Sequence, residues 1–305
     1  MFKVVRNKKQ GHRMSICTDS PQVYKANALI EASYRLSLYE QRILLACISQ
    51  VRRDQPITDT ILYSVTASQV AEMSGADVKT AYRDLKSASE RLFERRVTIH
   101  EAPNGKGKVS TLLTRWVQSV RYVESEGRIE LRFSKDMLPY LTELTEQFTK
   151  YALADVARMT SGHSIRIYEM LMQWQGTGER EVSMDWLRKS LQLEGRYPSF
   201  KDFRRRVIEP SIEQINEHSP VWVKWDQRKA GRKVTHLRFI FGLKSQVDNK
   251  KADERKKTKR LGGVNDDLVA GIPKSVIDQY ANPGESYALA AARLHAERRE
   301  GKGSW

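Results

Sequence analysis

Three consecutive arginines, Arg204, Arg205 and Arg206, lie in a segment with the apolar spacing of a helix, just after a turn-prone Pro198-Ser199. A guanidinium is planar and permanently charged, so it can bind a phosphate or the edge of a guanine base through paired hydrogen bonds. This chemistry predicts a surface that binds a polyanion. Further candidate contacts in this segment and in the hairpin that follows it are Lys201, Arg228, Lys229, Arg232 and Lys233.

Arginines on a helix most often form a solvated face, so the distribution of charge has to decide between the two interpretations. Residues 14–195 carry 24 Lys and Arg against 23 Asp and Glu, a net charge of +1, whereas residues 196–240 carry 11 against 5, a net charge of +6. The whole chain has a net charge of +16 and a pI near 9.8. The concentration of charge favours nucleic acid as the partner, ahead of an anionic membrane surface.

The helix that carries the arginines is expected to begin at an N-cap, either Ser199 or Asp202. On an ideal helical wheel Arg205 and Arg206 point away from the apolar side, while Arg204 points toward it. Pro210 lies inside the helix and must either kink it or start a new turn. Residues expected to face the core are Phe200, Phe203, Val207, Ser211 and Ile215.

Two strand-like runs, residues 221–225 and 234–241, follow this helix and are joined by the basic segment 228–233. A helix followed by a basic hairpin is the order of a winged helix, in which the helix reads the major groove of DNA. We expect the preceding helix of this unit at residues 182–193, with Trp186, Leu187 and Leu191 facing inward.

The same order of elements occurs earlier in the chain. Thr66 is a candidate N-cap for a helix at residues 67–73, Gly75 provides a turn, and Asp77 can cap a second helix. A strand at 97–100 and a basic hairpin tip at 103–108 follow. The pattern predicts an α+β chain with two tandem winged helices related by a weak internal repeat. The apolar side of the second helix consists of Val78, Ala81, Tyr82, Leu85, Ala88 and Leu92.

The remaining periodicities predict helices within 28–51 that break near Ser37, a strand at 61–65, and strands at 111–123 and 129–133. Residues 137–172 have a largely helical pattern, with a break at Ser161-Gly162, where Thr160 or Ser161 can act as N-cap. Residues 249–260 have no apolar periodicity and are typical of a solvated linker. Two short amphipathic helices are expected beyond it, at 264–280 and 286–299.

Several classes of function find no support in the sequence. It has no Gly-rich phosphate loop, its six histidines are scattered, and its two cysteines, Cys17 and Cys47, are far apart and fit a reducing cytosol. We therefore expect no catalytic residues, no metal site and no cofactor. The basic N-terminus lacks the apolar segment of a secretory signal, and the longest apolar run is too short to span a bilayer. A cytoplasmic protein is expected.

Four separated blocks of the sequence resemble the replication initiator proteins of iteron-containing bacterial plasmids, a family that includes the F plasmid initiator. The resemblance extends from about residue 23 to residue 243. The blocks are NALIEASYRLSLYEQRILLACI at 27–48, FTKYALADVARMTSGHSIRIYEMLMQW at 148–174, DFRRRVIEPSIEQINEH at 202–218 and GRKVTHLRFIF at 231–241.

The resemblance implies two winged-helix domains in a pseudo-twofold arrangement and binding of a monomer to direct repeats in double-stranded DNA at an origin. It implies a dimer, formed mainly through the first domain, that represses its own promoter at an inverted repeat. It also implies as partners a host initiator ATPase, the replicative helicase and chaperones that convert dimer to monomer, with no membrane partner.

The resemblance also assigns roles to residues. Base reading falls to Arg205 and Arg206 in the second domain, supported by Arg204 and by the hairpin residues Arg228, Lys229, Arg232 and Lys233, while Lys201 remains a candidate from its position in the segment. Phosphate contacts from the first domain are expected at Lys79, Thr80 and Arg83.

The expected domains are a basic flexible arm at 1–22, a first winged-helix domain at 23–150 for dimerisation and phosphate contacts, a second at 151–245 for sequence-specific binding, and a basic linker and tail at 246–305. Two other functions stay open at this point. They are a transcriptional repressor without a role in initiation, and a nucleic-acid enzyme, such as a nuclease or primase, that docks through its winged helices.

Overall fold

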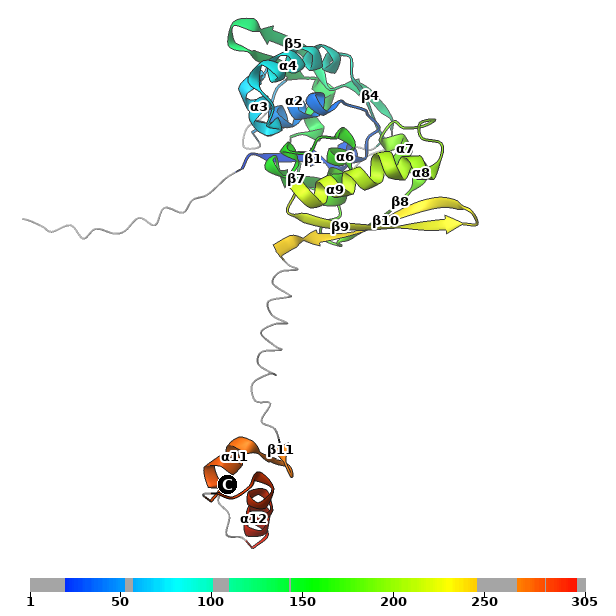
Figure 1. Cartoon of the computed structure of the whole chain (residues 1–305). Helices are drawn as coiled ribbons and strands as arrows, with labels where there is room; N and C mark the ends of the chain where they lie inside the picture. The colour runs from blue at the N-terminus through cyan, green and yellow to red at the C-terminus, as the bar shows by residue number, and fades with distance from the viewer. Residues whose placement is uncertain are drawn as a thin grey trace, which may run out of the picture. The chain divides into compact units, whose positions relative to one another are not determined.

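The computed structural model describes residues 20–52, 57–100, 110–142, 144–245, 268–282 and 284–300. The chain divides into two compact units, Met1–Lys244 and Ser245–Trp305 (Figure 1). The first unit contains all of the predicted DNA-binding residues and is described first.

The first unit contains one arrangement of elements twice. In each copy a helix is followed by a strand, a helix-turn-helix and a hairpin, and the last strand lies in the middle of a three-stranded antiparallel sheet, in the orders β2-β6-β5 and β8-β10-β9. The first copy comprises α2 (Leu38–Ile48), β2 (Tyr63–Thr66), α3 (Ala67–Ser74), α4 (Val78–Phe93), β5 (Val117–Val123) and β6 (Arg128–Phe133). The second comprises α6 (Gly162–Met172), β8 (Glu179–Ser183), α7 (Met184–Ser190), α8 (Phe200–Phe203), the wide-turn segment η3 (Arg204–Ile208), α9 (Glu209–His218), β9 (Val221–Ala230) and β10 (Lys233–Leu243). The predicted pair of winged helices is confirmed.

Other elements of this unit join or extend the two copies. Strand β1 pairs with β7, and β3 pairs with β4, both antiparallel. The bounds are β1 (Gln22–Ala26), α1 (Asn27–Glu31), β3 (Arg96–Ile99), β4 (Leu112–Arg115), η1 (Glu124–Glu126), η2 (Lys135–Tyr140), β7 (Phe148–Ala152) and α5 (Ala154–Ala157).

Local capping signals fix the helix starts where the sequence predicted them. Thr66 accepts a hydrogen bond from the Gln69 amide, and Asp77 caps α4 by accepting from the amides two and three residues on. Gly75 ends α3 with a φ of 68°, a left-handed conformation that glycine adopts without steric cost. Ser161, the second of the two N-cap candidates, caps α6.

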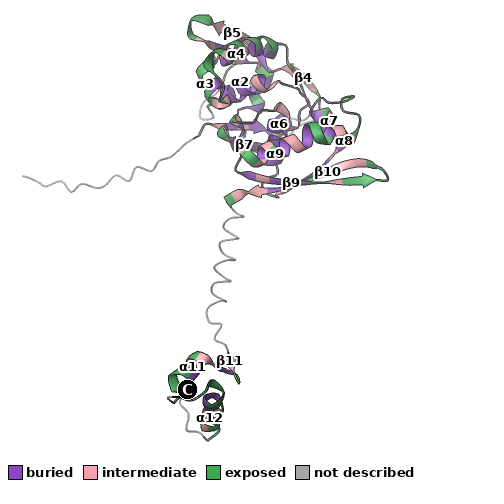
Figure 2. Ribbon diagram, viewed as in Figure 1, coloured by how far each residue is buried: buried purple, intermediate pink, exposed green. Residues whose placement is uncertain are grey.

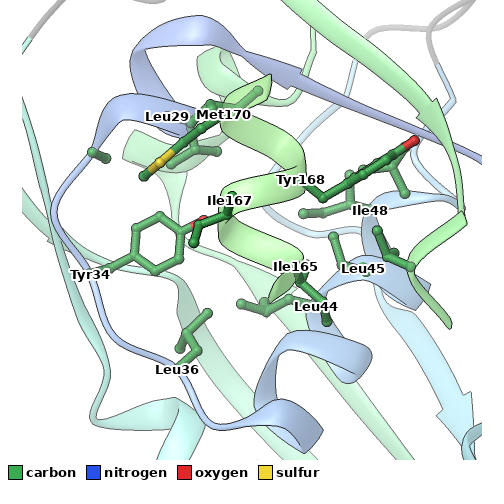
Figure 3. Packing of buried hydrophobic residues seen from close by; sticks show 14 of the residues in the cluster. Leu29, Tyr34, Leu36, Leu44, Leu45, Ile48, Ile165, Ile167, Tyr168 and Met170 are labelled. Carbon is green, nitrogen blue, oxygen red and sulfur yellow. The ribbon is translucent and has the colours of Figure 1, made fainter. Parts of the chain in front are cut away.

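The helix α6 runs through the middle of a continuous core that both winged helices share (Figures 2 and 3). Its apolar residues contact side chains from α1 and the segment that follows it, including Leu29 and Tyr34 in the close view of Figure 3. Cys47 is buried in this core, and burial raises the pKa of its thiol above the ordinary value. Cys17 lies outside the described residues.

Charged side chains are also buried beside α6. The Lys25 ammonium lies 2.6 Å from the Glu169 carboxylate, to which Tyr151 also donates, and Arg166 donates to the Ala32 carbonyl. Since β1 and β7 carry Lys25 and Tyr151, these hydrogen bonds join the strand pair to α6.

The sequence prediction was wrong at several elements. Residues 137–172 are not largely helical, because β7 within them extends to pair with β1, a partner more than 100 residues away. Val182 belongs to β8, and α7 begins at Met184 after its N-cap Ser183. Val78 does not face the core: it is 52% exposed at the first position of α4.

The first hairpin was also misplaced. The hairpin equivalent to β9–β10 is β5–β6, whose turn is the acidic η1, while the β3–β4 pair is an addition between α4 and this hairpin. The basic tip predicted at 103–108 lies outside the described residues, and so does the linker at 249–260.

The second unit has a small core of its own. The described part contains β11 (Leu268–Val269), β12 (Ile272–Pro273), α11 (Lys274–Tyr280) and α12 (Tyr287–Arg299). Ile272, Ile277 and Leu294 are buried together with two alanines of α12. The two predicted helices are present, but the first begins later than expected because residues 268–273 form a hairpin.

Candidate DNA interface

The predicted recognition helix is a continuous helical segment, α8–η3–α9, that begins at Phe200. The Ser199 hydroxyl accepts a hydrogen bond from the Lys201 amide at 3.2 Å, so Ser199, not Asp202, is the N-cap. The predicted inward side is confirmed: Phe200 is partly buried and the other four predicted residues are buried, as are Ile208 and Ile212 of the same helix. The buried residues of the predicted set are Phe203, Val207, Ser211 and Ile215.

Pro210 explains the widened turn in the middle of this helix. Proline has no N–H, and its ring would clash with the carbonyl four residues earlier in a regular α-helix. Here the Glu209 amide donates to the Arg204 carbonyl, five residues back, and the α-helical pattern resumes at Glu209 with Pro210 in its first turn. The helix thus passes Pro210 by adding a wide turn and starting a new one, the second of the two outcomes expected.

The three arginines all lie on the exposed side of the helix. The prediction that Arg204 points toward the apolar side was wrong, because the wide turn departs from the ideal 100° per residue and the long side chain reaches outward. Arg204 pairs with Glu209 at 3.2 Å and Arg205 with Asp202 at 3.5 Å. The Arg206 guanidinium forms no hydrogen bond or ion pair with another described residue, which leaves it available to a ligand.

The loop between α7 and α8 is held by Arg188. Its guanidinium donates to the carbonyls of Arg196 and Tyr197 at 2.6 and 2.8 Å, and it stacks on the Phe203 ring with 4.5 Å to the centroid. Desolvation lowers the pKa of Arg188 from its ordinary value. A side chain from α7 thereby fixes the loop that leads into the recognition helix.

The hairpin β9–β10 reaches past the helices, and its end is exposed (Figures 1 and 2). Because side chains alternate across a strand, Val221, Val223 and Lys229 share the face that is turned toward the helices. Arg228 lies on the opposite face, where its guanidinium is 2.8 Å from the Glu181 carboxylate of β8. Gly231 forms the turn with a φ of 60°.

A groove of about 630 Å³ lies between the recognition helix, the α7–α8 loop and the hairpin. Seven cationic side chains and one carboxylate, that of Asp185, line it. The cations are Arg188, Arg196, Lys201, Arg204, Lys229, Arg232 and Lys233. We call this the basic groove. The structure thus brings together five of the predicted contact residues, places Arg205 and Arg206 on the adjacent helix surface, and leaves Arg228 on the other face of the sheet.

In the first winged helix, the predicted residues lie in the first two turns of α4. Lys79 and Arg83 are exposed, the latter by 78% of its side chain, with Arg83 3.7 Å from Asp84. The Thr80 hydroxyl donates to Asp77 at 2.7 Å, and this hydrogen bond, with those from the Lys79 and Thr80 amides, lowers the pKa of Asp77.

The hairpin β5–β6 of the first winged helix offers no comparable basic surface. Its turn carries Glu124 and Glu126, and the Lys86 ammonium of α4 binds Glu124 at 2.8 Å. Arg128 is occupied by Glu126 and Glu130. The two winged helices are therefore alike in topology and different in charge.

Two findings concern other kinds of site. Within the described ranges no group of three His, Cys, Asp or Glu side chains is placed to hold a metal ion. No helix of the described part of the chain is long and apolar enough to cross a membrane.

Two family models match the chain in the order of the two winged helices. Residues 22–172 match "Initiator Replication protein, WH1", and residues 183–241 match "Initiator Rep protein, WH2". The chain belongs to the initiator replication protein family. The family resemblance expected from the sequence is confirmed.

Individual relatives agree with this membership. A "Replication initiation protein" from Escherichia coli is 31% identical over 234 residues, which cover 74% of this chain and 71% of that protein. A "PI protein" from Escherichia coli is 21% identical over 248 residues, covering 70% of this chain and 80% of that protein. The crystal structure of Pi initiator protein in complex with iteron DNA shares the fold, with a TM-score of 0.62 and 20% identity over 73% of this chain and 98% of that one.

Sequence reasoning missed Arg188 and Arg196 as parts of the basic groove. Arg196 is the first residue of the basic region 196–240 and was included in its charge count, whereas Arg188 lies just before that region. Their proximity to the hairpin depends on the sheet packing against the helices, which the local pattern does not specify.

Proposed function

We propose that this protein initiates replication of a plasmid by binding direct repeats in duplex DNA at the origin. The observation that carries the proposal is the basic groove, together with the exposed Arg206 on the recognition helix. Both lie in the part of the chain that matches the second family model. A row of cations positions the protein on phosphates, while an unpaired arginine on a helix can read guanine. The Pi initiator complex supports the choice of iterons as the repeats.

The two domains have different tasks in this proposal. The second, at 151–245, reads sequence through Arg205 and Arg206 and holds the backbone with Lys201, Arg204, Lys229, Arg232 and Lys233, with Arg228 as a weaker contact. The first, at 23–150, adds phosphate contacts from Lys79, Thr80 and Arg83 and forms the dimer. Residues 1–22 and 246–305 act as a basic arm and a linker with a tail.

The protein acts in the bacterial cytoplasm by binding, without catalysis and without a cofactor. As a monomer it occupies the origin repeats and recruits the host initiator ATPase and the replicative helicase. As a dimer it binds an inverted repeat and represses its own promoter, and chaperones convert the dimer to the monomer.

A titration tests the DNA-binding part of the proposal. The full chain is titrated against a duplex that carries a direct repeat from the DNA flanking its gene and against a scrambled duplex, each at two salt concentrations. We expect a preference for the repeat that persists at the higher salt, since non-specific binding depends mainly on counterion release. Equal binding that collapses with salt would contradict sequence-specific binding.

A genetic test separates an initiator from a repressor. A plasmid that carries only this gene and its flanking repeats should replicate, and deletion of the gene should abolish replication. Continued replication after the deletion, with promoter control lost, would show a repressor without a role in initiation.

A further inference from the structure

The loop between α7 and α8 has a strained backbone. Gln192 and Tyr197 have φ values of 50° and 51°, in the left-handed region that side chains disfavour, and Gly195 has a φ of 73°. Such conformations persist only where the surroundings hold them. Here the surroundings include Arg188, whose guanidinium binds the carbonyls of Arg196 and Tyr197.

The loop conformation directs one charged side chain at the basic groove. Arg196 is exposed and lines the groove together with Lys201 of the recognition helix and Lys229 of the hairpin. Its guanidinium forms no hydrogen bond or ion pair among the described residues. An arginine held in this way, among cations from three different elements, is suited to a phosphate oxygen, which accepts paired hydrogen bonds from a guanidinium.

We infer that the phosphate backbone of one DNA strand passes through the basic groove and that Arg196 binds one of its phosphates, with Arg188 as the positioning residue that holds the loop. The inference rests on the proposed function and extends it to the loop before the recognition helix. Arg188 acts on DNA through its hydrogen bonds to the loop carbonyls, and Arg196 acts by direct contact.

The variant Arg196→Gln tests the contact. Lys224→Gln is a matched control, because Lys224 is an exposed cation on β9 that lies on the sheet face away from the groove. Each full-length variant is titrated against the repeat duplex and the scrambled duplex over a range of salt concentrations.

We expect Arg196→Gln to weaken binding several-fold on both duplexes and to reduce the slope of log affinity against log salt by about one, as for the loss of one phosphate contact. The control should leave the slope unchanged. An unchanged slope for Arg196→Gln overturns the inference. If instead the wild type shows no preference for the repeat, the proposed function fails while the slope test of Arg196 still gives its own answer.

The variant Arg188→Lys tests the positioning role. Lysine keeps the charge, but a single ammonium lacks the planar fork that reaches two carbonyls while stacking on Phe203. We expect faster amide hydrogen exchange at residues 191–199, and a salt slope reduced as in Arg196→Gln. Combining the two substitutions should add little to either one. Unchanged exchange, or losses that add fully in the double variant, would overturn the role of Arg188.

Discussion

Arg228 and Lys229 are adjacent in β9 but face opposite sides of the sheet. Lys229 lines the basic groove, whereas Arg228 is turned away and binds Glu181 of β8 at 2.8 Å. The two residues carry the same charge and were equivalent candidates in the sequence. Their surroundings make them unequal as contacts for DNA.

The first prediction compares these neighbours. Lys229→Gln should weaken binding to repeat and scrambled DNA about equally and lower the salt slope by about one, since a phosphate contact carries no sequence information. Arg228→Gln should change the slope less, because its charge is already offset by Glu181. Salt-dependent titrations of both variants check this. A larger loss for Arg228→Gln would show that DNA contacts the other face of the hairpin.

The second prediction concerns Arg206, which has no partner among the described residues. Arg206→Ala should cost roughly 1–3 kcal/mol of binding free energy on the repeat and much less on scrambled DNA, if its guanidinium reads a base edge. Competition titrations with single-base variants of the repeat locate the base, because the variant should no longer distinguish substitutions at that position. Equal losses on both duplexes would make Arg206 a backbone contact.

The third prediction concerns the first winged helix. Lys79→Gln should weaken binding to all duplexes and reduce the salt slope by about one, since Lys79 is exposed at the start of α4. Lys135→Gln, a change at an exposed lysine of η2 outside the helix-turn-helix, serves as the control and should leave the slope unchanged. Identical slopes for wild type and Lys79→Gln would remove this helix from the DNA surface.

The fourth prediction concerns the buried Glu169. Burial disfavours its carboxylate, but the adjacent Lys25 and Arg166 charges outweigh burial and hold the pKa of Glu169 below its ordinary value. Glu169→Gln leaves the buried Lys25 charge without its counter-charge, so we expect a loss of about 3–5 kcal/mol of unfolding free energy at pH 7. Denaturant unfolding measures it.

The same group predicts a dependence on pH. Since the pKa of Glu169 is lower in the folded protein, its stabilising contribution is fully present above the ordinary value of 4.5 and disappears as pH falls through the folded pKa. The difference in stability between wild type and Glu169→Gln should therefore shrink below pH 4.5. A constant difference across this range would contradict an ionised Glu169 in the core.

Features that depend on neighbours in sequence were predictable. Thr66, Asp77, Ser161 and Ser199 are N-caps because a short polar side chain satisfies amides two or three residues on. The predicted buried positions Phe203, Val207, Ser211 and Ile215 of the recognition helix follow from a spacing of four residues. The family blocks then determined the fold class and the assignment to replication initiators.

Features that depend on distant partners were decided only by the tertiary structure. Alternating apolar and polar residues indicate that a strand has two faces, but they do not identify the strand that pairs with it. The segment of β7 was therefore predicted as helix, because its pairing with the distant β1 is not visible in the local sequence. For the same reason the first hairpin was placed one strand pair too early. Tertiary contacts also decide which cations can bind DNA. The charge of Arg228 is offset by Glu181 of another strand. Arg196 lines the basic groove, and its loop is held by Arg188 of α7. The sequence determines the number of charged side chains, but whether one of them can bind a DNA phosphate depends on the neighbouring side chains that folding brings close to it.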